Sequence, residues 1–277
     1  MCEASDDAYW RHDRLTTLEL MQREWERCKK VCPLLAVFGI FIALFKIDWL
    51  HCADQGVAAD FLGNLFSYLV KNIMPGSNKE QRCNALSVEV FQFYKDNPKI
   101  EDTLKEFVLK SFQPEKSTQP PKLKGNAAST RALVPFGHLM AKRYLSDAIP
   151  HEGAMKAAAD HLWNCYESLR EDNAAVAHEA LYLNAKKFAL QYAALHDAFG
   201  KEKQWLPKPK MHMFLELCSA NTEPQKFWNY RDEDFGSTVA RQSKMKGSWK
   251  ILRSYCVHAH DMFRMKNSVP RITSDKS

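Results

Sequence analysis

An apolar run that ends at an acidic residue constrains this chain more than any other feature. Residues 38–69 read FGIFIALFKIDWLHCADQGVAADFLGNLFSYL, in which the run ends at Asp48 and His51 follows three positions later. Phenylalanine and isoleucine favour extended backbone, so we expect a strand over residues 41–48. The apolar residues that follow recur at helical spacing, which predicts a helix over residues 56–70. Many α/β folds present a carboxylate at a strand end in this way.

Composition narrows the class of protein. The chain has 277 residues, 45% of them hydrophobic, which is enough for the core of one large or two small domains. Its formal net charge of +6 permits a nucleic-acid partner without requiring one. The eight cysteines are scattered with no CxxC pair, and we expect no signal peptide. These features predict reduced thiols in an intracellular protein, either nuclear or cytoplasmic.

A membrane segment is the first alternative to consider, because residues 31–45 carry no charge. This stretch is shorter than the roughly 20 residues that a spanning helix needs. Pro33 and Gly39 also interrupt it. A buried strand or core segment explains the stretch better, so we expect no membrane contact.

Helical periodicity dominates the rest of the chain. Helices are expected over residues 15–25, 77–95, 100–110, 131–144, 153–169, 174–199, 211–218 and 235–265. Ser77 and Glu80 have the spacing of a capping box at the start of the second of these helices. Residues 113–126 are rich in proline and lysine and are expected to form an exposed loop, and residues 205–210 a rigid connector.

Asp48 and His51 can be interpreted in two ways. If a helix begins just after the strand, a spacing of three residues places both side chains on one side of the turn. They could then form an active-site carboxylate and the histidine that orients it. The alternative is an aspartate that caps the helix N-terminus beside a partly buried histidine, because aspartate is a favoured capping residue.

The C-terminal part of the chain holds an acidic cluster followed by a basic run. Glu233 stands between two aspartates and behind Trp228 and Tyr230. Its carboxylate could bind a divalent metal such as Mg²⁺, or the cluster could complement the dipole of the helix that follows. The basic residues after it could contact DNA phosphates or form a solvated face. They are Arg241, Lys244, Lys246, Lys250 and Arg253.

Three segments together resemble a known family. Residues 45–51, FKIDWLH, resemble the Asp-x-x-His element of DDE-class cut-and-paste DNA transposases, with the CACTA-type group and its relatives as the nearest pattern. Residues 209–212, PKMH, look like the family's short Pro-x-x-His-Leu stretch. Residues 228–233, WNYRDE, match its Trp-x-Tyr-x-x-Glu pattern. The order and separation of the three segments agree with the family over roughly residues 38–255.

The resemblance implies a site and an ancestral chemistry. Glu233 corresponds to the third metal ligand, and Asp48 and His51 would be a catalytic or orienting pair beside it, with Asp48 as a second Mg²⁺ ligand. Such sites cleave DNA phosphodiesters and transfer strands with two metal ions held by carboxylates. The first two acids of the family should lie on strands upstream of Asp48, where Asp6, Asp7 and Asp13 stand in polar sequence with no strand around them. We therefore expect this chain alone to be inactive, unless a second chain or an oligomer supplies the missing part of the core.

The expected fold is mainly α, a helical bundle with a small β element near residues 36–48 that would be part of an RNase H-like core. The expected divisions are a polar N-terminal helix (1–30), a partial core (31–76), a helical insertion (77–206), a C-terminal segment with the acidic motif and basic helix (207–265), and a disordered tail (266–277). The alternative to a transposase-derived protein is a non-catalytic helical module that binds nucleic acid or protein through the basic C-terminal helix.

Overall fold

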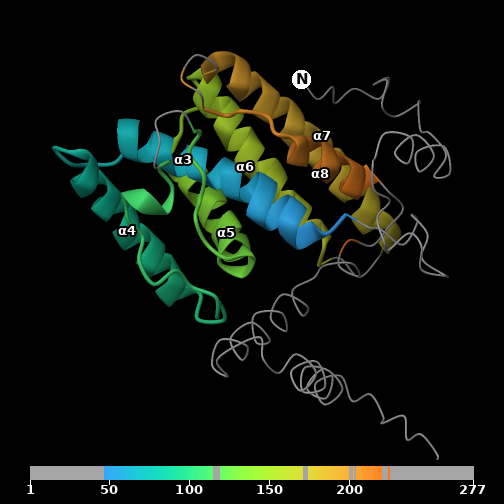
Figure 1. Ribbon diagram of the computed structural model, residues 1–277, viewed down its shortest axis with the longest axis horizontal. Coiled ribbons are helices and arrows are strands. Elements are labelled where there is room, and N and C mark those ends of the chain that lie inside the picture. Colours follow the sequence, from blue (N-terminus) through green and yellow to red (C-terminus); the bar gives the residue numbers. More distant parts are fainter. Residues whose placement is uncertain are drawn as a thin grey trace, which may run out of the picture. The chain divides into compact units, whose positions relative to one another are not determined.

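Helices make up most of the part of the chain that can be described (Figure 1). The computed structural model describes residues 47–114, 119–170, 174–199, 202, 204–219 and 224. All of them lie within one compact unit. The prediction of a mainly α fold is confirmed, and these residues contain no strand. The expected helices over residues 15–25 and 235–265 lie outside the described residues.

The strand expected over residues 41–48 finds no support where it can be checked. Residues 41–46 lie outside the described part, and Ile47 and Asp48 form no strand. Trp49 already has helical backbone angles, φ −59° and ψ −46°. The chain therefore enters a helix directly at Asp48, and the described residues give no support to a small β element or a partial RNase H-like core.

The helix predicted over residues 56–70 exists and begins earlier. A π-helical segment, η3 (Leu50–Ala58), continues without a break into α3 (Ala59–Asn72). A π-helix is rare at this length, and short π segments inside helices are often found at functional sites. Nearly every residue of α3 is buried, which is typical of a helix enclosed by others. Phe61 contacts Phe188 on one neighbour with ring centroids 5.6 Å apart, and Phe66 contacts Phe136 on another at 5.8 Å.

Helix α4 (Lys79–Asp96) begins one residue later than the expected capping box. Asn78 is the N-cap, and its side-chain oxygen accepts a hydrogen bond of 2.9 Å from the Gln81 amide. The Gln81 side chain in turn accepts one of 2.9 Å from the Ser77 amide. The cap is therefore Asn78 rather than Ser77, and the Gln81 side chain bonds the amide one residue before the cap instead of closing a capping box.

The prediction of a helix over residues 100–110 is wrong. Only one 3₁₀ turn, η4 (Leu109–Ser111), is formed there. Phe107 and Phe112 stand on either side of this turn and pack on each other and on Phe66, with ring centroids 5.4–6.3 Å apart. Burying both rings against α3 requires an irregular backbone, so tertiary packing overrides the local helical pattern.

The four remaining helices lie where periodicity predicted them; one has the predicted bounds and the other three begin two to four residues earlier. They are α5 (Ala127–Tyr144), α6 (Pro150–Ser168), α7 (Ala174–Phe199) and α8 (Pro209–Ser219). Asn126 caps α5 by accepting a 2.7 Å hydrogen bond from the Ser129 amide. Figure 1 shows α7 lying alongside both α6 and α8, which packs this part of the molecule as a helical layer.

The loop expected to be exposed at residues 113–126 is partly buried where it is described. Pro121 and Leu123 are buried, and the Leu123 amide donates a 2.8 Å hydrogen bond to the Ala59 carbonyl. The backbone of Lys122 crosses α3 at Gly63, where a Cβ atom would lie 2.3 Å from the Lys122 Cα atom. Glycine at this position therefore permits the close approach.

Buried Asn64 of α3 fastens two irregular segments to the helix. Its side-chain nitrogen donates to the Pro121 carbonyl at 3.3 Å, and its side-chain oxygen accepts from the Trp205 amide at 3.1 Å. Trp205 has a positive φ of 54°, an uncommon conformation for a large residue. Its ring is fully buried against Phe61 and Tyr192. The connector that leads into α8 is thus held to α3 on both its backbone and its side chain.

Candidate functional site

The Asp48 carboxylate caps the start of η3. It accepts hydrogen bonds from the amides of Leu50 at 3.3 Å and His51 at 3.1 Å, and it pairs with His51 Nδ1. The Asp48 side chain is 13% exposed, whereas that of His51 is 56% exposed. The carboxylate caps the helix as in the capping alternative, but the His51 side chain is exposed and not partly buried as that alternative expected.

The positions of the other predicted site residues relative to Asp48 are not described. Glu233 lies outside the described residues, as do the basic residues Arg241, Lys244, Lys246, Lys250 and Arg253. Within the described ranges, no group of three or more histidine, cysteine, aspartate or glutamate side chains could hold a metal ion. The site expected from the sequence is therefore represented here only by Asp48 and His51.

The segment that begins α8 packs directly against the Asp48 turn. Lys210 Nζ donates a 2.7 Å hydrogen bond to the His51 carbonyl, and the Cys52 thiol contacts the Lys210 carbonyl at 3.5 Å. Trp49 and Phe214 stack edge to face with centroids 5.7 Å apart. The two segments that carry Asp-x-x-His and Pro-x-x-His are thus neighbours, although 159 positions separate His51 from Lys210.

A glycine makes this approach possible. A Cβ atom on Gly56 would lie 2.7 Å from Lys210 Cδ, closer than van der Waals contact allows. The aliphatic stem of the lysine therefore occupies the space that a side chain on η3 would need. Its amine, in turn, reaches along the helix to the His51 carbonyl.

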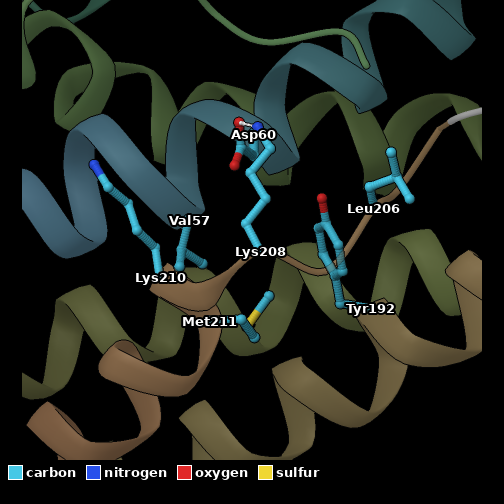
Figure 2. A pocket seen from close by; sticks show the side chains of 7 residues that line it. All are labelled: Val57, Asp60, Tyr192, Leu206, Lys208, Lys210 and Met211. Atoms are coloured by element: carbon cyan, nitrogen blue, oxygen red, sulfur yellow. Dashed lines mark hydrogen bonds and ion pairs between the residues drawn. The ribbon is translucent and has the colours of Figure 1, made fainter. Parts of the chain in front are cut away.

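A small pocket opens beside the contact between α3 and the start of α8 (Figure 2). Asp60 lines it, is 6% exposed and accepts a 2.7 Å hydrogen bond from Lys208 Nζ. The other residues that line it are Val57, Tyr192, Leu206, Lys210 and Met211. Figure 2 shows Asp60 and Lys208 meeting across the pocket while the Lys210 amine extends in a different direction.

Lys122, from the loop that crosses α3, adds a third positive charge to this region. Burial lowers the pKa of its amine, the charges of Lys208 and Lys210 lower it further, and the Asp60 carboxylate partly offsets these effects. Asp60 interacts with Lys208, 148 positions away, and with Lys122, and partners so distant could not be found from local spacing. The available signal was the presence of an aspartate among the apolar residues of a buried helix.

The thiols near this region are not activated. Burial, with smaller contributions from the nearby aspartates, raises the pKa of Cys52 to about 12. A nucleophilic cysteine requires the opposite shift, since the thiolate is the reactive form. Cys52 is therefore a core residue.

A second buried carboxylate fastens η3 to α6. Asp54 is fully buried and accepts a 2.5 Å hydrogen bond from the Tyr166 hydroxyl. The guanidinium of Arg131 lies over the Tyr166 ring, 5.9 Å from its centroid. Sequence reasoning did not single out Asp54, and its bonding to a core tyrosine is that of a structural contact.

Comparisons with protein-family models, curated proteins and solved structures found no match to this chain. None of the described helices is both long enough and apolar enough to cross a membrane.

Proposed function

We propose that this chain is a helical DNA-binding protein of the DDE-class transposase lineage, whose ancestral chemistry was Mg²⁺-dependent cleavage and strand transfer of DNA. The observation that supports the proposal is the packing of the Asp48 turn against the start of α8. The Asp-x-x-His and Pro-x-x-His-Leu segments are both part of the resemblance. Lys210 donates a hydrogen bond to the His51 carbonyl and so joins these two segments, which lie far apart in the sequence.

The described residues do not fit a Mg²⁺ site. The Asp48 carboxylate accepts two amide hydrogen bonds and pairs with His51, which uses most of its acceptor capacity. In the proposal, Asp48 and His51 therefore position the start of η3, and Glu233 is the metal ligand that the resemblance provides. We expect this chain alone not to cleave DNA.

DNA binding is assigned to the basic residues 241–253, which follow the acidic motif. Contacts between lysine or arginine and phosphate release counterions, so binding of this kind weakens steeply as salt increases. Because the contacts are electrostatic, reversing one charge within the run should weaken binding at every DNA sequence. Removing the Glu233 carboxylate should not weaken it.

The test combines a binding assay with a cleavage assay on the purified chain. Lys250→Glu should weaken duplex binding and reduce its salt dependence, whereas Glu233→Gln should leave both unchanged. Lys95→Glu, at an exposed position of α4, is the matched control for the charge reversal. Binding that is insensitive to salt, or that Lys95→Glu and Lys250→Glu weaken equally, would contradict the proposal. Cleavage with Mg²⁺ or Mn²⁺ that Glu233→Gln abolishes would contradict the expected inactivity.

A further inference from the structure

Helix α7 carries two large apolar side chains on the face that points away from the core. Leu183 is 47% exposed and Leu190 is 50% exposed, whereas Leu181, Phe188 and Leu195 of the same helix are buried. Seven positions separate the two exposed leucines, so they lie on one side of the helix, two turns apart. A single exposed leucine is common on protein surfaces. Two at this spacing form the kind of stripe that packs between the helices of a coiled coil.

Charged residues flank Leu183 on the same face in an order that is complementary to itself. Glu179 lies one turn before Leu183 and Lys187 one turn after it, and both are exposed. Neither forms an ion pair with another residue in the described part of the chain. Residues four positions apart form a ridge along a helix, and such a ridge packs into the grooves of a second helix. This ridge contains an acid, a leucine and a base, which match an identical ridge that runs in the opposite direction.

We propose that this face of α7 binds a second copy of the chain, with the two α7 helices antiparallel about a twofold axis at Leu183. Each Leu183 side chain then faces its counterpart, and Glu179 of each copy faces Lys187 of the other, so the contact contains two ion pairs. Lys186 falls opposite Ala180, and no like charges meet there. A parallel arrangement would place Glu179 beside Glu179 and Lys187 beside Lys187, and repulsion between like charges disfavours it.

The contact is small, because one helix from each copy supplies it. Stable protein interfaces bury roughly 1,200–2,000 Å², and a single pair of helices buries less. We therefore expect a weak dimer with a Kd on the order of 10 µM. The leucines supply the apolar burial, and the charges determine the direction of the second helix. None of these residues belongs to the basic run at 241–253, so this inference does not depend on the proposed function.

Sedimentation equilibrium of the full chain, at concentrations from about 1 to about 300 µM, spans the expected Kd and measures the association. Glu179→Lys or Lys187→Glu alone turns both ion pairs into contacts between like charges, and each should raise the Kd by about tenfold. The double variant with both changes restores the complementary order and should dimerise like the wild type. A mixture of the two single variants should also dimerise, because two lysines of one copy then face two glutamates of the other.

A change at the centre of the contact and a matched control complete the test. Leu183→Glu should abolish the dimer, whereas Val88→Glu, at a 69% exposed position of α4, should not change it. Circular dichroism checks that the variants fold, which we expect because all the changed side chains are exposed and glutamate and lysine favour helices. A wild-type chain that stays monomeric throughout, or a dimer that Leu183→Glu and Val88→Glu affect equally, overturns the proposal. A mixture of the single variants that associates no better than either variant alone also overturns it.

Discussion

At the scale of single residues, Asp48 acts on the helix that follows it. Its carboxylate satisfies two amides that the first turn would otherwise leave without a partner. Asp48→Ala should therefore lower the free energy of unfolding by about 1 kcal/mol. Asp48→Asn should retain most of the stability, because the amide oxygen can accept the same bonds. Urea unfolding followed by circular dichroism measures the free energy of unfolding of both variants. Equal stability of Asp48→Ala and the wild type would argue against the capping role.

The ion pair between Asp60 and Lys208 is a second contact between single residues that stabilises the fold. Lys208→Gln leaves a buried carboxylate without its cation, which should cost about 2 kcal/mol of unfolding free energy. This value is below that of a fully buried pair because the Lys208 side chain is 36% exposed and water screens the charge.

A double-mutant cycle tests the coupling within this pair. Asp60→Asn combined with Lys208→Gln should cost less than the two single changes added together, because neither partner is left charged and alone. Additive losses in urea unfolding would mean that the two side chains do not stabilise one another.

At the scale of elements, the crossing of the loop over α3 depends on Gly63. A Cβ atom there would lie 2.3 Å from backbone of Lys122, which cannot move aside as a flexible side chain would. Gly63→Ala should destabilise the fold by about 1–3 kcal/mol, even though alanine favours a helix more than glycine does.

Gly153, in α6, is the matched control for this prediction. Its Cβ atom would come no closer than 3.7 Å to the Asp147 carbonyl oxygen, an ordinary contact. Gly153→Ala should therefore raise stability by up to about 1 kcal/mol. Thermal unfolding of the two variants should move the midpoint in opposite directions, and a shift of the same sign would contradict the crossing geometry.

At the scale of the whole molecule, the buried thiols predict how stability depends on pH. Burial raises the pKa of Cys52 to about 12 and that of Cys83 to about 11, and it also raises the pKa of Cys165 and Cys218. The folded state thus keeps these protons at pH values where the unfolded chain has lost them. The contribution of these thiols to the free energy of unfolding is therefore fully present below pH 9, the approximate pKa of a thiol in the unfolded chain. It falls as the pH rises from there through the pKa values of the folded state.

Thiol labelling checks this prediction together with the packing of the core. In the native state at pH 8, iodoacetamide should modify these four cysteines far more slowly than in urea, because the thiolate is the reactive form. Mass spectrometry of the peptides reports each cysteine separately. Rapid native labelling of Cys165, which is fully buried, would contradict the described packing.

The sequence by itself determined the helices that carry a clear apolar repeat. Helices α5, α6, α7 and α8 lie where periodicity predicted them. Each buries one face against a neighbour, and the apolar residues of that face recur at helical spacing in the sequence. It also paired Asp48 with His51, since a spacing of three residues brings two side chains together within a single helical turn.

The tertiary structure alone decided the features that depend on distant partners. Phe107 and Phe112 pack on α3 and prevent the helix that their own segment favours. The backbone of a loop nearly 60 positions away packs against Gly63, and Asp60 pairs with a lysine 148 positions away. A contact between segments so far apart leaves no periodic signal in either one. The candidate site is therefore a product of packing, because only the folded chain brings the Asp48 turn, Asp60 and the start of α8 together.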